Sequence, residues 1–128
     1  MRRSTRLPLL LALGLTLGLA ACQPDYGSLE IEVGSSPPLP VSIHDHDFQL
    51  PVGIAVLINV TPVSANSNNY VETDEVELSS DDRTILSVEP GPEARSFVLT
   101  GVKVGETCVQ VYVNGGREEC IPTTVSAE

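Results

Sequence analysis

The strongest constraint on the fold is an alternation of apolar residues in the middle of the chain. Apolar side chains occupy every second position from Val52 to Val60. Successive side chains of an extended chain point to opposite faces, so a period of two predicts a strand with one core-facing side. Pro62 has no backbone N–H for a sheet ladder and is expected to end this strand. The segment therefore predicts the longest core-facing strand of a β-protein.

Shorter segments of the same kind surround this strand. Residues 29–33 alternate apolar and acidic side chains, which is typical of a half-exposed strand. The Pro-rich segment 34–40 and the Asn- and Ser-rich segment 64–70 are expected to be breaks. Further strands are expected at residues 76–78, 85–88, 97–99, 108–113 and after the turn at 114–116. Without a convincing amphipathic helix, the chain is predicted to be all-β, and a sandwich is favoured over a small barrel.

The N-terminal segment has the order of a secretory signal. Arg2, Arg3 and Arg6 precede a Leu-rich run, which leads through two alanines to Cys22. The run is too short, and too interrupted by Pro and Gly, for a membrane-spanning helix. The ending Leu-Ala-Ala-Cys resembles the lipobox of bacterial lipoproteins. This resemblance implies cleavage after residue 21, lipidation of Cys22 and, because Gln23 rather than Asp follows, an outer-membrane location.

Cleavage would leave one domain with a strongly acidic charge. Residues 22–28 would be the lipidated cysteine and its tether, and residues 29–128 a single sandwich. The signal carries three of the seven basic residues and none of the seventeen acidic ones, so the formal charge changes from −10 to −13. Such a charge disfavours nucleic acid as a partner. The absence of Trp also disfavours an aromatic platform for bases or sugars.

Two cysteines remain after Cys22, and they are expected to pair. Cys108 and Cys120 flank an alternating strand and a turn, and an oxidising export compartment favours a disulfide. Val109, Val111 and Val113 would face the core, which places both cysteines on the outer face near opposite positions of one hairpin. We expect a structural disulfide rather than a redox centre, since redox cysteines are usually closer in sequence.

The order of motifs between residues 50 and 125 carries a second resemblance. Leu-Pro-Val-Gly at 50–53, Ser-Ser-Asp-Asp at 79–82 and Leu-Thr-Gly-Val-Lys-Val-Gly at 99–105 each precede or follow an expected strand. This order is similar to a bacterial immunoglobulin-like domain of group 2, a module of adhesins and envelope proteins. The resemblance implies an immunoglobulin-like β-sandwich of about seven strands. Gly101 and Gly105 would form tight corners, where a positive φ is often needed.

One candidate metal site is the segment His44, Asp45, His46, Asp47, which contains the only histidines of the chain. In an extended segment the two imidazoles would share a face, and imidazoles bind Zn²⁺. Two ligands do not make a complete site, so a third would have to come from elsewhere. The alternative, which we favour at this point, is a polar linker in solvent.

A second candidate is an acidic stretch. Several closely spaced carboxylates suit Ca²⁺, but the loop spacing of a calcium-binding hand is absent. A solvated acidic rim is the preferred interpretation. The residues concerned are Glu72, Asp74, Glu75, Glu77, Asp81 and Asp82.

Nothing in the sequence indicates catalysis. A nucleophile elbow, a phosphate-binding glycine loop and a helical metal motif are all missing, and no cofactor is implied. The sequence therefore predicts a membrane-anchored, non-catalytic envelope lipoprotein that acts as a structural or protein-binding module of the adhesion type. Its partners would be the membrane, through the lipid on Cys22, and an unidentified protein or cell surface. The alternative is a divalent-metal-binding envelope protein that uses the histidine segment and the acidic loops.

Overall fold

The computed structural model describes residues 23–127, which form nine strands and no helix. The expected signal segment 1–21 and Cys22 lie outside the described residues. Within residues 23–127, no helix of sufficient length and apolar character to cross a membrane is present. The strands are β1 (Tyr26–Val33), β2 (Ser42–Ile43), β3 (Phe48–Pro51), β4 (Ala55–Ser64), β5 (Val76–Ser80), β6 (Leu86–Pro90), β7 (Ser96–Gly101), β8 (Gly105–Val113) and β9 (Gly116–Ser126).

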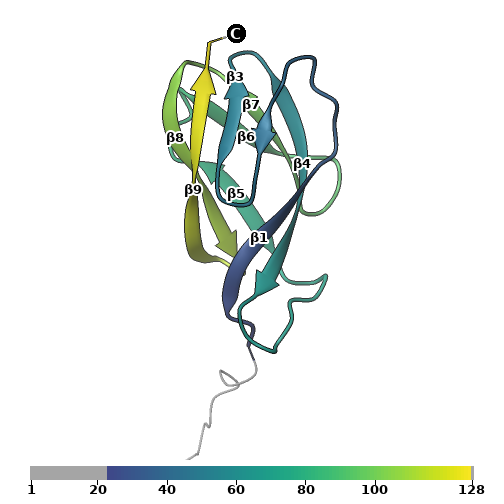
Figure 1. Ribbon diagram of the computed structural model, residues 1–128. Helices are drawn as coiled ribbons and strands as arrows, with labels where there is room; N and C mark the ends of the chain where they lie inside the picture. Colours follow the sequence, from purple (N-terminus) through teal and green to yellow (C-terminus); the bar gives the residue numbers. More distant parts are fainter. Residues whose placement is uncertain (1–22, 128) are drawn as a thin grey trace, which may run out of the picture.

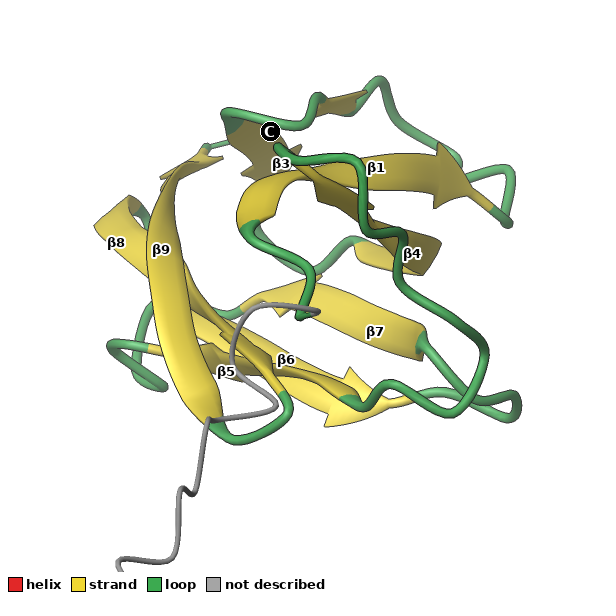
Figure 2. Ribbon diagram, turned by 90° about the horizontal axis from the view of Figure 1, so that it is seen from below, coloured by secondary structure: helices red, strands yellow, loops and turns green. Residues whose placement is uncertain are grey.

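The strands form two sheets packed face to face (Figure 1; Figure 2). One sheet has the order β1-β4-β7-β6, and the other has the order β2-β3-β9-β8-β5. Neighbouring strands are antiparallel except β3 and β9, which are parallel. If β1 and β3 are taken as the two parts of a split first strand and β2 is set aside, seven strands remain in the immunoglobulin order. The predicted immunoglobulin-like β-sandwich is therefore confirmed.

The core lies between the sheets and follows the predicted alternation. In β4, Val56 and Ile58 are fully buried, while Ala55 points outward. They meet the inner face of β8, where Val109 and Val111 are also fully buried. Burying one such side chain contributes about 1.5–3 kcal/mol, so the repeated alternation is sufficient to fix which face of each strand points inward.

The long strand does not end at Pro62, as predicted, but continues to Ser64. Pro62 is buried and pairs with Leu29 of β1. The N–H of Val60 donates to the carbonyl of Arg95, on the side of β7. The nitrogen of Pro62, two residues further, faces the same side, but β7 pairs with β4 only as far as Asn59. The missing N–H therefore removes no ladder hydrogen bond.

The segment from His44 to Asp47 has its first three residues exposed, as expected for a polar linker, but it joins two strands directly. Phe48 and Leu50 lie in β3 and are almost fully buried, and β3 pairs with the C-terminal strand β9. Gln49, between them, is exposed, so β3 shows the same period of two in a segment of only four residues. Such a short strand is stable here because β9 supplies its hydrogen bonds. At the N-terminal end of the domain, β1 begins at Tyr26, which lies inside the segment 22–28 that was expected to be a tether.

Gly101 is required for a reason other than the predicted positive φ. A Cβ at this position would lie 2.5 Å from the carbonyl oxygen of Pro51. The two backbones approach closely because Gly53 N–H donates to the Gly101 carbonyl and a bridge joins Val52 to Gly101. Gly101 thus permits the contact between the end of β7 and the turn after β3.

Candidate functional site

The sandwich has two ends, and the chain enters at one and leaves at the other (Figure 1). We call the end that carries Gln23, the loop 65–75 and the turn at Asn114–Gly115 the entry pole. The opposite end, with the turn 52–54, the loop 81–85 and the turn 102–104, is the exit pole; β9 also ends there. The two poles differ in the side chains they expose.

Exposed apolar and free basic side chains meet at the exit pole. Val102 and Val104 are 48% and 54% exposed, among the most exposed large apolar side chains of the described residues. Lys103 lies between them, and the turn is fixed because the Val102 and Lys103 N–H groups both donate to the Ile85 carbonyl. Arg83 lies in the loop that contains Ile85. This pole therefore offers apolar contact area beside two cations.

Those two cations are the ones that the fold itself does not use. Among residues 23–127, the side chains of Arg95 and Arg117 donate hydrogen bonds, whereas Arg83 and Lys103 make neither a hydrogen bond nor an ion pair. Arg83 and Lys103 thus stay free to contact another molecule.

The entry pole is acidic and internally braced. Asn114, at the β8–β9 turn, accepts from the Glu75 N–H at 2.9 Å and donates to Asp74 at 3.0 Å. The Asp74 carboxylate also accepts from the Val71 N–H at 2.7 Å. This backbone hydrogen bond, followed by that from Asn114, holds the pKa of Asp74 below its usual value. The carboxylate therefore closes a loop and does not merely form part of a solvated rim.

Arg95 fixes the same loop from the other sheet. Its guanidinium donates to the carbonyls of Val71, at 2.6 Å, and Asp74, at 2.8 Å. The φ of Arg95 is 60°, a conformation that L-residues rarely adopt. A cavity of about 440 Å³ remains at this pole, lined in part by Gln23, Tyr70 and Glu118. Its carboxylates make it unsuited to an anionic ligand.

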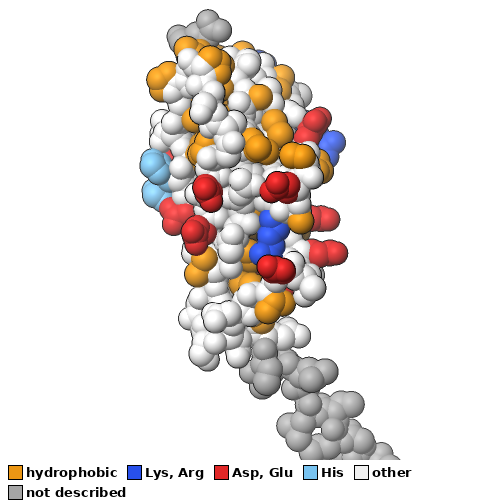
Figure 3. Space-filling model, turned by 90° about the vertical axis from the view of Figure 1, so that its right-hand side faces the viewer, with side chains coloured by type: hydrophobic (Ala, Val, Ile, Leu, Met, Phe, Trp, Pro, Cys, Tyr) orange, Lys and Arg blue, Asp and Glu red, His pale blue; other side chains and the backbone are white. Residues whose placement is uncertain are grey.

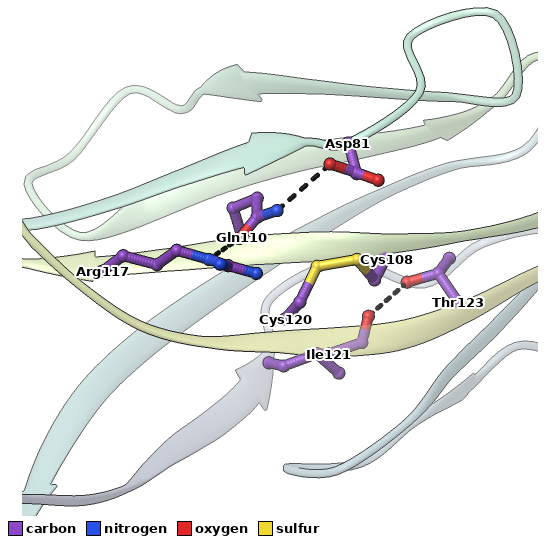
Figure 4. Close-up of a disulfide and its surroundings, with 7 residues drawn as sticks. All are labelled: Asp81, Cys108, Gln110, Arg117, Cys120, Ile121 and Thr123. Atoms are coloured by element: carbon purple, nitrogen blue, oxygen red, sulfur yellow. Dashed lines mark hydrogen bonds between the residues drawn. A yellow bond between two sulfur atoms is a disulfide. The ribbon is translucent and has the colours of Figure 1, made fainter.

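The outer face of the β8–β9 hairpin carries the predicted disulfide (Figure 4). Cys108 and Cys120 are bonded with a Cα–Cα distance of 5.3 Å, and both are half-buried. They are diagonal neighbours and not directly opposite, because Cys108 pairs with Pro122 and Cys120 with Gln110. Gln110 donates to Asp81 at 3.1 Å and accepts from Arg117, which extends the polar network beside the disulfide. These contacts join β8, β9 and the end of β5.

The histidine segment forms a tight turn between β2 and β3. The His44 N–H donates to the Asp47 carbonyl at 2.9 Å, which closes the turn. The two imidazole rings are stacked, with centroids 5.9 Å apart and planes inclined by 16°. His46 Nδ1 donates to Asp45 Oδ1 at 2.7 Å, and this hydrogen bond raises the pKa of His46. The pair lies exposed on the surface beside acidic side chains (Figure 3).

The acidic stretch does not gather into one site. Asp82 lies at the exit pole, where its carboxylate accepts hydrogen bonds from the Thr84 hydroxyl and N–H, and these lower the pKa of Asp82. Asp74 lies at the entry pole, and Glu77 points outward from β5. Within the described part of the chain, no three His, Cys, Asp or Glu side chains are grouped so as to hold a metal ion.

The described residues also lack a catalytic arrangement around the histidines. Among residues 23–127, neither imidazole hydrogen-bonds to a Ser, Thr or Cys side chain, and the only hydrogen bond of either ring is the one from His46 to Asp45. Sequence reasoning found the disulfide and the histidine pair. It missed the exit pole, because nothing in the local sequence shows that residues 83–85 and 102–104 come together.

Fold and surface together define a two-sheet immunoglobulin-like domain without an evident catalytic centre in residues 23–127. No protein-family model matches the sequence, and no curated protein matches it. Solved structures of the S-layer protein SbsC are similar in fold. Domains 4 and 5 of SbsC align with a TM-score of 0.52 at 17% identity, over 72% of this chain and 54% of that one. The structure of domains 1–6 aligns with a TM-score of 0.52 at 18% identity, over 83% of this chain.

The chain is shorter than these proteins. It spans about half of the two-domain SbsC structure (54%) and 14% of the six-domain structure. At such low identity the likeness establishes the all-β sandwich fold and nothing about ligands.

Proposed function

We propose that this chain is a non-catalytic structural and protein-binding module of the cell envelope, held in the outer membrane by lipid on Cys22. The observation that carries the proposal is the segregation of exposed side chains along the long axis of the domain. The exit pole presents Val102 and Val104 beside Arg83 and Lys103, with Asp81 and Asp82 in the same loop as Arg83, while the entry pole presents carboxylates braced by Arg95. The similarity in fold to S-layer protein domains is compatible with a structural envelope role.

The geometry favours the exit pole as the binding surface. A tether at residue 22 would hold the entry pole near the membrane and direct the exit pole away from it (Figure 1). The anchor is stable only if at least two acyl chains are buried, as lipoprotein processing would provide. Apolar side chains supply contact area, and the charged side chains of both signs around them, Arg83 and Lys103 beside Asp81 and Asp82, form a polar rim. The expected partner is therefore a protein with an apolar surface that is bordered by charged side chains.

Site-specific crosslinking tests this binding surface. A photoreactive residue replaces Lys103 at the exit pole or Thr73 at the entry pole, and the chain is crosslinked in intact envelopes. We expect a discrete adduct from position 103 only, which the double substitution Val102→Ser/Val104→Ser removes. Val71→Ser is the matched control, because Val71 is similarly exposed (59%) but lies at the entry pole. Equal adducts from both poles would contradict the proposal.

The anchor is tested separately. Cys22→Ser is expected to move the chain from the membrane fraction to the soluble fraction, and mass spectrometry of the wild-type N-terminus should find the lipid on Cys22. Protease treatment of intact and lysed cells then shows whether the domain faces outward or the periplasm. A chain that stays with the membrane after Cys22→Ser would argue against a lipid anchor.

The alternative, a divalent-metal-binding envelope protein, has support only at the histidine turn. The acidic loops give it none, since Asp74 and Asp82 lie beyond opposite ends of β5 and each is already hydrogen-bonded.

A further inference from the structure

The β2–β3 turn places both imidazoles of the chain on a firm support. Ile43 and Phe48 pair on either side of the turn, and Phe48 is fully buried in the core. The hydrogen bond from His44 N–H to the Asp47 carbonyl closes the backbone between them. Gln49 donates to the Asp47 carboxylate at 3.1 Å, which fixes the last residue of the turn. The histidines therefore project from an ordered hairpin and not from a linker.

The separation of the rings suits a shared ligand. A dication bound to one nitrogen of each ring at about 2.0–2.1 Å would place the two ring centroids about 5–6 Å apart. The observed centroid distance is 5.9 Å. The nearly parallel planes require the rings to rotate about their side-chain torsions before both nitrogens aim at one point. His44 is exposed and its ring makes no hydrogen bond among the described residues, so that ring can turn while His46 keeps its hydrogen bond to Asp45.

Asp45 orients one of the two rings. Because His46 Nδ1 donates to Asp45 Oδ1 at 2.7 Å, the unprotonated nitrogen of the neutral ring is Nε2. Carboxylates hold metal-binding histidines in this way, since the hydrogen bond fixes the tautomer and increases the basicity of the free nitrogen. The hydrogen bond to Asp45 would add little to two imidazoles that bind no ligand. It would strengthen the binding of a cation held by both rings.

The surroundings favour a cation and leave room for its water ligands. Glu30 of β1 lines a cavity of about 390 Å³ together with His44 and Asp45. Figure 3 shows acidic side chains directly beside the histidines. Imidazole nitrogen selects borderline ions such as Zn²⁺, Ni²⁺ and Cu²⁺ over Ca²⁺ and Mg²⁺, which prefer oxygen.

We propose that the β2–β3 turn binds one divalent transition-metal ion through Nε2 of His46 and a ring nitrogen of His44, with Asp45 as the orienting group. Water fills the remaining positions, so the ion is exchangeable and open to a further ligand. This site does not depend on the exit pole, and either proposal can fail without the other.

Calorimetric titration with Zn²⁺ tests the site. The protein is the full-length chain, purified in detergent without a histidine tag, so that His44 and His46 are its only imidazoles. We expect one equivalent of Zn²⁺ to bind and Ca²⁺ to give no heat. His46→Ala and His44→Ala should each abolish the single-site isotherm. Asp45→Asn should weaken binding roughly tenfold or more, the usual effect of losing such an orienting carboxylate.

Controls separate this site from adsorption to acidic residues. Glu72→Gln removes an exposed carboxylate at the entry pole and should leave the affinity unchanged. Nuclear magnetic resonance adds a second readout, because the ring protons of both histidines should shift with Zn²⁺ while resonances of the exit pole should not. No binding by the wild-type chain at millimolar Zn²⁺, unchanged binding after either histidine substitution, or a loss on Glu72→Gln would each overturn the proposal.

Discussion

Removing the Cys108–Cys120 disulfide is expected to destabilise the domain mainly through its unfolded state. The cysteines are 12 positions apart in the sequence. Closing a loop of that size lowers the entropy of the unfolded chain enough to stabilise the fold by about 3 kcal/mol. The native state should change little, since both cysteines lie on the outer face and the core face of β8 keeps Val109 and Val111. The double substitution Cys108→Ser/Cys120→Ser should therefore cost about 3 kcal/mol.

Urea denaturation of the chain from residue 23 onward measures this cost. The variant and the wild-type domain treated with dithiothreitol should lose the same free energy of unfolding, because both lack only the crosslink. The dependence of that free energy on urea should steepen slightly, since an uncrosslinked unfolded chain exposes more surface. A loss of unfolding free energy below about 1 kcal/mol would mean that the hairpin persists in the unfolded state. A loss above about 5 kcal/mol would mean that the packing of the native state depends on the disulfide. Either result would refute the reasoning.

Three further substitutions test other parts of the structure. Gly101→Ala forces its Cβ against the Pro51 carbonyl and should cost about 1–3 kcal/mol in thermal or urea unfolding; an unchanged stability would show that the backbones can separate. Hydrogen bonds from Thr84 lower the pKa of Asp82, so their stabilisation is present above the unfolded pKa, near pH 4, and is lost as the pH falls through the folded value. Asp82→Asn should thus have a lower urea midpoint than wild type at pH 7, and the difference should shrink as the pH falls below about 4; a deficit that does not change with pH would contradict this. Arg95→Ala should cost about 2 kcal/mol and speed amide exchange across residues 71–75, whereas unaltered exchange would exclude the guanidinium as their support.

Local pattern was sufficient for most of the sandwich. Alternation predicted the inward faces of β4 and β8, because one buried sheet face imposes a period of two wherever a strand is long enough to show it. The same alternation placed Cys108 and Cys120 on the outer side of one hairpin, close enough to bond. The all-β class and the disulfide therefore followed from residues that are neighbours in sequence.

The parts that were missed depend on contacts between distant residues. β3 has only four residues, and all four pair with β9, which lies more than seventy positions later and runs parallel beside it. Pro62 lies within a strand because β7 pairs with β4 no further than Asn59, a register that no local pattern reveals.

The candidate binding surfaces divide in the same way. The histidine pair was visible in the sequence, since its members are two residues apart, but the turn that stacks them was not. The exit pole could not be predicted from the sequence. Its β7–β8 turn and the loop of Arg83 are distant in sequence, and hydrogen bonds to the Ile85 carbonyl bring them together. The sequence by itself thus determined the inward faces of the longer strands and which cysteines pair, because these follow from alternation along single strands. The tertiary structure alone decided which exposed side chains share a surface, because that depends on how separate strands are paired.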